Sequence, residues 1–326
     1  MNDRPKVLVT APFRGEGLET LRELCSDVVL DPWIDHRPLR LYRAEQLAER
    51  IEAEGANLLI VESDSVKGPV LDLPLLAIGS CRGDPTNVDI DGATDRGIPV
   101  LRAPGRNADA VAELTVGLIL AVNRGILRAD RDVREGQVWR DGTIPYQRFR
   151  AWQLEGRTAG LVGLGAVGRA TKWRLEGLGM RVIAHDPFAA EATHSLPELL
   201  AEADIVSMHA SVNLETHGMI AREQFALMKD EAIYINTARA LLHDTDDLVA
   251  ALRAGEIAGA GLDHFVGENL PPDHPFCAMS NVVLTPHIGG ATYDTEVNHS
   301  RSIANGLRVL FEGGRPTNLV NPEVLR

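Results

Sequence analysis

The stretch TAGLVGLGAVGRA, from Thr158 to Ala170, decides the fold because it joins a short apolar run to a glycine-rich turn and the start of a helical pattern. Gly163, Gly165 and Gly168 form a G-x-G-x-x-G spacing directly after that run. A strand, a tight glycine turn and a helix in this order are typical of the first βαβ unit of a dinucleotide-binding sheet. We therefore expect such a unit here.

Each part of this motif has a physical reason. Gly163 permits the tight turn, Gly165 lets the backbone approach a pyrophosphate, and Gly168 lets the helix pack closely on the strand. The N-terminus of the helix offers free N–H groups and a positive dipole to phosphates. Asp186, which lies 23 positions after Gly163 (186 − 163), ends the next apolar run. A carboxylate there accepts hydrogen bonds from the adenine ribose and repels a 2′-phosphate, so the sequence predicts NAD rather than NADP. The alternative is that the glycines only serve turns within the sheet.

Short runs rich in Val and Ile alternate with amphipathic stretches along the chain, which predicts an α/β fold of parallel sheets with helices on both faces. Pro104 and Gly105 interrupt the pattern, and a second break follows His287. We expect one domain from residues 1–103 and 291–326 and a second from residues 104–290. A helix is expected from about Asn107 to Arg128, and the last helix from about Tyr293 to Glu312. The expected strands lie within residues 6–12, 57–63, 75–80, 98–104, 158–165, 181–187, 203–210, 231–238, 259–265 and 281–287.

Composition excludes some classes of function. The chain has 326 residues and a formal net charge of -13. Such an acidic balance argues against a nucleic-acid partner and against an anionic membrane surface. No apolar run approaches the roughly 20 residues that span a bilayer, and no signal peptide is evident. Three widely spaced cysteines suggest neither a disulfide framework nor a metal site, so we expect a cytoplasmic protein.

Three polar residues follow strand-like runs in the second half of the chain. Arg239 ends YINTARA, Glu268 follows GLDHFVG, and His287 ends VVLTPH. In an open parallel sheet, ligands bind outside the carboxyl ends of the strands, so these side chains can converge. A guanidinium holds a carboxylate, an imidazole exchanges a proton near neutral pH, and a neighbouring carboxylate orients that imidazole. With a nicotinamide, this set suits interconversion of a 2-hydroxy acid and its 2-oxo acid.

The chain resembles the D-isomer-specific 2-hydroxyacid dehydrogenase family over nearly its whole length. The resemblance rests on Asn87–Glu113, Gly156–Gly168 and the short motifs INTARA, AGLDHF, HPF, TPHIGGAT and NLVNPEVL. It implies two Rossmann-like domains with the substrate in the cleft between them, and a homodimer formed by the cofactor domains through the helix after Asn107. It also implies Arg239, Glu268 and His287 as the catalytic set.

The same resemblance implies further binding residues. The cofactor residues are expected to be Gly163, Gly165, Ala166, Val167, Gly168, Asp186, Thr237, Asp263, Gly289 and Gly290. Ala166 and Val167 would contact the pyrophosphate through their backbones, and Thr237 and Asp263 would lie beside the nicotinamide.

The sequence departs from the family pattern at the substrate loop, which reads GSCRGDPTNVD (Gly79–Asp89). We expect the Gly83 and Asp84 N–H groups to bind the substrate carboxylate together with Arg239. Arg82 either binds a further polar part of the substrate or pairs with a surface acid. Glu62 and Asp64 would repel a phosphate, which disfavours phosphoglycerate.

A second departure is His264, where the family's usual DVF reads DHF. Both a role near the nicotinamide and a simple packing substitution fit this residue. The remaining histidines show no metal-ligand spacing, and no metal is expected. An alternative function is a NAD-sensing scaffold of corepressor type with little turnover.

Overall fold

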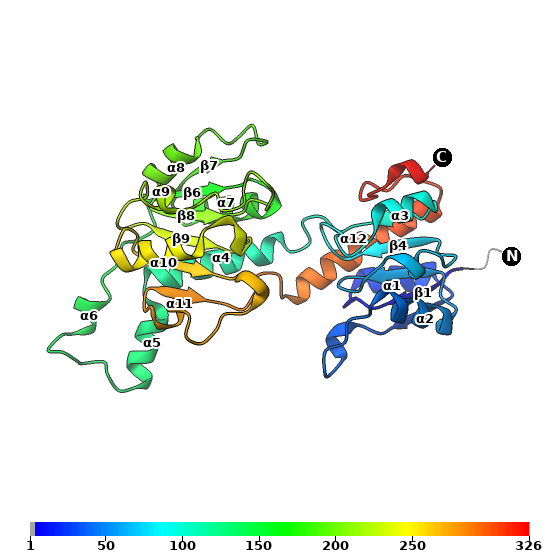
Figure 1. The fold of residues 1–326 in the computed structure, drawn as a ribbon, viewed down its shortest axis with the longest axis horizontal. Coiled ribbons are helices and arrows are strands. Elements are labelled where there is room, and N and C mark those ends of the chain that lie inside the picture. The colour runs from blue at the N-terminus through cyan, green and yellow to red at the C-terminus, as the bar shows by residue number, and fades with distance from the viewer. Residues whose placement is uncertain (1–3, 326) are drawn as a thin grey trace. The chain divides into compact units, whose positions relative to one another are not determined.

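The computed structural model describes residues 4–325, whose strands form two separate parallel sheets. Clustering of contacts divides the chain into two units. The first unit runs to Asn107 and resumes at Thr292, and the second is Ala108–Ala291. Both sheets have helices on their two faces, which confirms the predicted fold class (Figure 1).

The first unit contains a five-stranded sheet in the order β2-β1-β3-β4-β5. Side chains alternate along its strands, so that Val7 and Val9 enter one apolar cluster and Leu8 enters another. Helices cover both clusters because each face of the sheet is apolar. The strands are β1 Lys6–Val9, β2 Asp27–Leu30, β3 Leu58–Val61, β4 Ala77–Ser80 and β5 Val100–Leu101, and the helices are α1 Glu16–Leu24, α2 Ala44–Glu54, α3 Ile90–Asp95 and α12 Tyr293–Phe311.

The second unit contains a six-stranded sheet in the order β11-β10-β9-β8-β6-β7. Its apolar side chains likewise divide into two clusters, one on each face of the sheet. The strands are β6 Thr158–Val162, β7 Arg181–His185, β8 Ile205–Met208, β9 Ile233–Asn236, β10 Gly259–Leu262 and β11 Val282–Leu284. The helices are α4 Ala108–Asn123, α5 Ile126–Arg134, α6 Pro145–Arg148, α7 Ala166–Gly177, α8 Leu196–Glu202, α9 Arg222–Phe225, α10 Thr245–Ala254 and α11 Pro275–Ala278.

One local expectation was wrong, and one strand was missed. The single helix expected from about Asn107 to Arg128 is divided into α4 and α5, because Gly125 adopts a left-handed conformation with φ 59°. Strand β2 was not expected, and it is a short, partly exposed strand at the edge of its sheet. A short edge strand buries too little apolar surface to give a continuous hydrophobic run.

The units divide a few residues away from the expected positions. Residues 104–107 belong to the first unit, where Arg106 pairs with Glu62 at 2.5 Å and donates to His299 Nδ1 at 2.8 Å. These contacts extend the first unit past Pro104.

Among the described residues, no single helix has the length and hydropathy needed to cross a membrane. By those two criteria alone, α4 and α5 qualify together as a pair bent by 62°.

Candidate active site

The glycine motif forms the turn between β6 and α7. Gly163 has φ 103°, and a Cβ on it would lie 2.7 Å from the Ala210 N atom. A Cβ on Gly168 would lie 2.1 Å from the Gly163 carbonyl oxygen. Side chains are therefore excluded at both positions by packing within the protein. Gly165 differs, because a Cβ there would meet no described atom within 4 Å.

The open space at Gly165 lies where α7 begins. Ala166 and Val167 are the first two residues of this helix, and their N–H groups have no partner within it. Free N–H groups and the helix dipole together make a site for anions such as a pyrophosphate. The turn thus fits the dinucleotide that its sequence predicts.

Asp186 follows β7 beside this turn. Its carboxylate accepts hydrogen bonds from the N–H groups of Leu164 at 2.7 Å and Phe188 at 2.8 Å. Partial burial opposes its ionisation, but the backbone hydrogen bonds and the charge of Arg169 outweigh burial and lower the pKa of Asp186. A negative charge is therefore held at the position where a ribose hydroxyl would bind.

His287 and Glu268 meet at the carboxyl edge of the same sheet. Glu268 ends the 3₁₀ turn that follows β10, and His287 lies three residues after β11. The two strands are adjacent and parallel, so their carboxyl ends are neighbours. His287 Nδ1 lies 2.9 Å from Glu268 Oε2, and the two side chains are 47% and 58% exposed. The imidazole is thus oriented by a carboxylate and still accessible to a substrate.

Asp263 holds the loop that carries His287. This carboxylate is fully buried and accepts from Thr285 Oγ1 at 2.6 Å, Ile288 N at 2.9 Å and Gly289 N at 2.8 Å. The Asp263 carbonyl also accepts from the His287 N–H at 2.9 Å. Four hydrogen bonds thus connect the end of β10 to the loop after β11 and fix the backbone of His287.

Gly289 packs tightly against this arrangement. A Cβ there would lie 3.0 Å from Asp263 Oδ2, so a larger residue would push against the buried carboxylate. Gly290 follows in the same loop and is partly exposed.

Arg239 follows β9, the next strand of the sheet, and its side chain is exposed. The Asn236 side chain donates to the Arg239 carbonyl at 2.8 Å and accepts from the Ala238 N–H at 3.0 Å, which fixes the turn. Thr237 is buried, and its hydroxyl lies 2.8 Å from that of Thr115 on α4. The guanidinium therefore projects from an anchored turn.

His264 lies beside His287 and Glu268. Its ring centroid lies 3.8 Å from that of His287, and the residue is only 5% exposed. Burial and the positive charges of His287 and Arg239 lower the pKa of His264 to about 4. The structure thus brings Arg239, Glu268 and His287 to one sheet edge around a histidine that was not assigned to the site.

The predicted substrate residues lie in the first unit, in the loop after β4. Arg82 and Gly83 are partly buried and Asp84 is exposed. Within residues 4–325, Arg82 makes no ion pair, and the nearby acid Asp89 instead caps α3 by accepting from the Gly92 N–H at 3.0 Å. The alternative of a pair between Arg82 and a surface acid is thus not what the structure shows.

The two acids expected to repel a phosphate have structural partners. Asp64 is fully buried and accepts from Thr10 Oγ1 at 2.5 Å and Tyr42 N at 2.6 Å. Glu62 pairs with Arg106. Glu62 is thus paired with a cation, whereas Asp64 is held by neutral donors, and the expectation that these acids disfavour a phosphate stays a prediction.

Three supporting residues were missed. Asn236 holds Arg239 through a hydrogen bond within the same turn, whereas Thr285 and Thr115 contact Asp263 and Thr237, which lie 22 and 122 positions away in the chain. Only the polar residues at the ends of the apolar runs signalled Asn236 and Thr285, and no sequence pattern signalled Thr115.

Comparison with known proteins defines the class to which this site belongs. The family model for the NAD-binding domain of D-isomer-specific 2-hydroxyacid dehydrogenases matches residues 116–289. A glyoxylate reductase of Thermofilum pendens is 41% identical over 99% of this chain and 96% of its own length. A putative 2-hydroxyacid dehydrogenase of Bacillus subtilis, YoaD, is 36% identical over 96% of this chain and 92% of its own length.

A solved structure agrees with these relatives. The TT0316 protein of Thermus thermophilus is 37% identical and has a TM-score of 0.81, with 97% of this chain and 99% of that chain covered. The chain belongs to the D-isomer-specific 2-hydroxyacid dehydrogenase family. It is an NAD-dependent oxidoreductase that interconverts 2-hydroxy acids and 2-oxo acids.

Proposed function

We propose that the protein reduces a small 2-oxo acid of the glyoxylate and hydroxypyruvate type to the corresponding 2-hydroxy acid, as the D-isomer where the product is chiral, with His287 as the proton donor. The observation that carries this role is the 2.9 Å contact between His287 Nδ1 and Glu268 Oε2, which leaves the other ring nitrogen of His287 for the substrate. Relatives named glyoxylate reductase support the substrate class.

The roles of the three residues follow from their chemistry. Arg239 binds the substrate carboxylate and polarises the neighbouring carbonyl. Bound NADH supplies the hydride that the carbonyl carbon receives. His287 donates its proton to the carbonyl oxygen, so that the hydroxyl group forms as the C–H bond forms. Glu268 keeps the ring in one orientation through its contact with Nδ1.

Substitution of His287 tests this assignment. His287→Ala is expected to lower kcat for glyoxylate or hydroxypyruvate by about 100-fold or more, which is the scale of lost general acid catalysis. NADH binding, measured by fluorescence, should be retained. His217→Ala removes an exposed histidine of the same unit and serves as the control. NADH binding without turnover of any 2-oxo acid by the unmodified protein would overturn the proposal and favour a NAD-sensing scaffold.

We also propose that Arg82 contributes to substrate binding. Support comes from its partly buried guanidinium, which has no ion pair among the described residues, and from the adjacent Gly83 and Asp84 N–H groups. Arg82→Ala should raise KM for the 2-oxo acid by about tenfold or more. Arg102→Ala removes an exposed arginine of the same unit and should leave KM unchanged.

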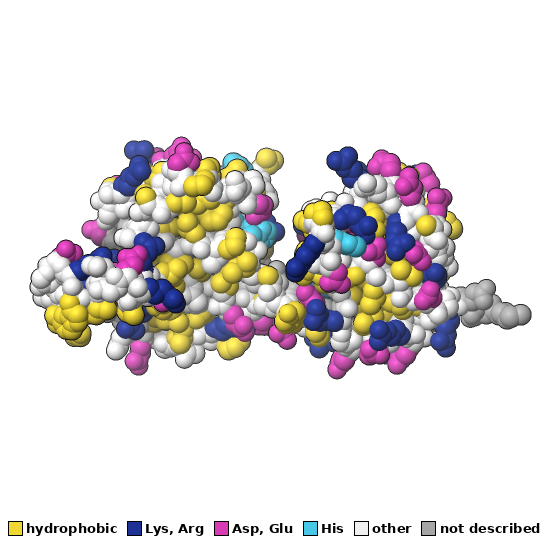
Figure 2. Space-filling model, turned by 90° about the horizontal axis from the view of Figure 1, so that it is seen from below, with side chains coloured by type: hydrophobic (Ala, Val, Ile, Leu, Met, Phe, Trp, Pro, Cys, Tyr) yellow, Lys and Arg dark blue, Asp and Glu magenta, His cyan; other side chains and the backbone are white. Residues whose placement is uncertain are grey.

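A homodimer through the second unit is the last part of the proposal. The segment containing α5 and α6 extends from this unit (Figure 1). Large apolar side chains are exposed on it (Figure 2). Exposed fractions reach 66% for Val133, 73% for Trp139 and 76% for Tyr146. Contiguous apolar surface of this kind marks protein interfaces.

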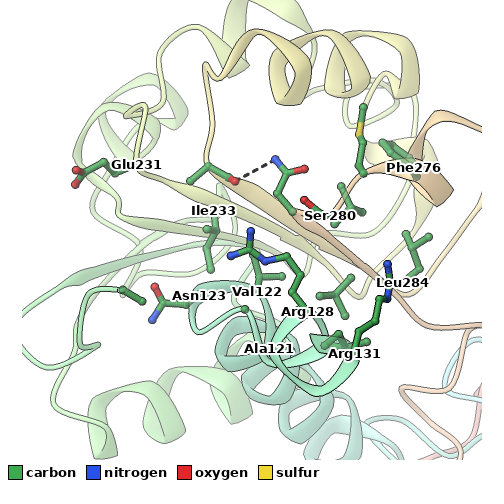
Figure 3. Close-up of a pocket in the computed structure, with 18 of the residues that line it drawn as sticks. Ala121, Val122, Asn123, Arg128, Arg131, Glu231, Ile233, Phe276, Ser280 and Leu284 are labelled. Carbon is green, nitrogen blue, oxygen red and sulfur yellow. Dashed lines mark hydrogen bonds between the residues drawn. The ribbon is translucent and has the colours of Figure 1, made fainter. Parts of the chain in front are cut away.

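A groove at the base of this segment supports the same interface. It is lined by Val122 of α4, Arg128 of α5, Phe276 of α11 and Leu284 of β11 (Figure 3). Its lining also includes Glu231 and Asn281, just before β9 and β11, but none of Arg239, Glu268 and His287. The groove is therefore distinct from the catalytic set and available to a second copy of the chain.

The oligomeric state tests the interface directly. Trp139→Ser combined with Val133→Asp should convert a dimer into a monomer in light scattering coupled to size exclusion. Leu214→Ser removes a fully exposed apolar residue elsewhere in the second unit and should leave the dimer intact. A monomeric unmodified protein would contradict the interface.

A further inference from the structure

His264, Glu268 and His287 together form a set of ligand atoms that can bind a metal. Each offers one atom, and these atoms all lie within 4.8 Å of one another. Two imidazoles and a carboxylate make up the three-ligand set that zinc and related divalent metals use in sites with an open fourth position. The sequence does not reveal this set because the ligands come from two separate loops.

His264 supplies an independent observation that points to a ligand. It is 5% exposed, and within residues 4–325 its Nδ1 atom has no hydrogen-bond partner. A buried polar atom without a hydrogen-bond partner destabilises the fold. The ring also contacts His287, since the two centroids are 3.8 Å apart. A simple packing substitution would favour an apolar side chain at this position.

We propose that His264, Glu268 and His287 bind a divalent transition metal of the zinc class. Ligand atoms about 2.0–2.1 Å from a tetrahedral ion lie about 3.3 Å apart, so some separations must contract. Glu268 and His287 have the freedom to do so, because their side chains are 58% and 47% exposed. His264 is the fixed ligand around which the two exposed ones close.

Metal binding and proton donation exclude each other at His287. The ion takes a nitrogen lone pair of the ring and an oxygen of Glu268, so the hydrogen bond between the two residues is lost. Zinc therefore acts as a reversible inhibitor, because it occupies the imidazole in place of the proton that His287 would donate. This inhibition rests on the proposed catalytic role of His287, whereas metal binding itself does not.

The donor set also determines which ions bind. Imidazole nitrogens favour Zn²⁺, Co²⁺ and Ni²⁺, and Mg²⁺ prefers an octahedral shell of oxygens. Mg²⁺ at the same concentration should neither bind nor inhibit.

Direct binding is the first arm of the test. The full-length protein, freed of metal with a chelator, is titrated with Zn²⁺ in competition with a chromophoric indicator, and with Co²⁺ by visible absorption. One equivalent per chain and an intense tetrahedral Co²⁺ spectrum are expected. His264→Val should weaken Zn²⁺ binding by about 100-fold. Cys277→Ser, which removes the exposed thiol, is the matched control and should bind as tightly as the unmodified protein.

A second variant distinguishes the loss of a metal ligand from misfolding of His264→Val. Glu268→Gln changes an exposed ligand, retains the shape of the side chain and should also weaken Zn²⁺ binding by at least tenfold. Circular dichroism and NADH binding establish that both variants are folded. Equal Zn²⁺ affinity in the unmodified protein and His264→Val, or an octahedral Co²⁺ spectrum, overturns the site.

Activity is the second arm. Zn²⁺ should inhibit NADH-dependent reduction of glyoxylate in the unmodified protein, and a chelator should restore the rate. Stoichiometric binding that leaves the rate unchanged supports the metal site and contradicts the proposed role of His287. The two ideas therefore fail separately.

Discussion

His287 and Glu268, whose side chains meet at 2.9 Å, both have left-handed backbones, with φ values of 54° and 56°. Only Asp141 shares this property among the non-glycine residues that the structure describes. Such conformations cost free energy in residues with a Cβ, and they persist where the surrounding structure holds them. The contact between the imidazole and the carboxylate is thus built on two backbone positions that the fold must enforce.

Loss of the Glu268 charge should affect the rate but not cofactor binding. Glu268→Gln is expected to lower kcat by about tenfold or more, because a neutral amide forms a weaker hydrogen bond with the imidazole than a carboxylate does. KM for NADH should change by less than a factor of two. Steady-state kinetics measure both constants, and Glu256→Gln, at an exposed position of the same unit, is the control. An equal effect of both substitutions would contradict the role of Glu268.

The anchoring by Asp263 gives a prediction for its partner. Thr285→Val removes the hydroxyl that donates to Asp263 Oδ1 at 2.6 Å and preserves the shape of the side chain. The expected loss in unfolding free energy is about 1 kcal/mol. Asp263→Asn should lose more, about 1–3 kcal/mol, because an amide cannot accept from all three donors and a buried N–H is left unpaired. Urea denaturation orders the two variants, and a reversed order would refute the anchoring.

Asp186 should control the choice between NADH and NADPH. Its lowered pKa keeps the carboxylate charged, and this charge repels a 2′-phosphate. Asp186→Ser is expected to reduce the ratio of kcat/KM for NADH over NADPH by at least tenfold. Arg169, which neighbours this carboxylate, provides the phosphate with a positive charge once the acid is removed. Glu191→Gln, which changes only the exposed partner of Arg169, is the control and should leave this ratio unchanged.

Acid should destabilise the first unit through His299. This fully buried ring accepts from Arg106 at Nδ1, at 2.8 Å, and its Nε2–H donates to the Pro12 carbonyl at 2.6 Å. Burial lowers the pKa of His299 to about 4, against about 6.5 in the unfolded chain. The unfolded state therefore binds the extra proton first as the pH falls.

The contribution of His299 to the unfolding free energy is fully present above about pH 6.5. It is lost as the pH falls towards 4, by up to about 3 kcal/mol. His299→Gln can accept from Arg106 and donate to Pro12 but does not titrate, so its unfolding free energy should fall less between pH 7 and pH 4.5. Urea denaturation at several pH values measures the difference. A parallel decline in both proteins would exclude His299 as the cause.

Much of the architecture is predictable because parallel strands buried on both faces leave continuous apolar runs in the sequence. The two features that the sequence did not predict each have a physical reason. Strand β2 is a half-exposed edge, and the break at Gly125 depends on a single left-handed residue. Local pattern does not distinguish such a glycine from one tolerated within a helix.

The candidate site also combines residues that the sequence predicts with contacts that it does not. Arg239, Glu268 and His287 were predictable because their strands end at one sheet edge. The links that hold them in place, such as the pair of Thr115 and Thr237, join residues 122 positions apart (237 − 115). The contact of His264 with His287 depends on how neighbouring loops fold back, which no spacing in the sequence records.

The discontinuous first unit has a consequence for synthesis on the ribosome. Ile303, Ala304 and Leu307 of α12 are fully buried in the same apolar cluster as Val7 and Leu58. Helix α1 covers only part of this face of the first sheet, so the face stays incompletely covered until α12 has been translated, whereas the second unit is complete once Ala291 has emerged. The unit that begins first is thus the last to finish folding, and the nascent N-terminal sheet must avoid aggregation during that delay.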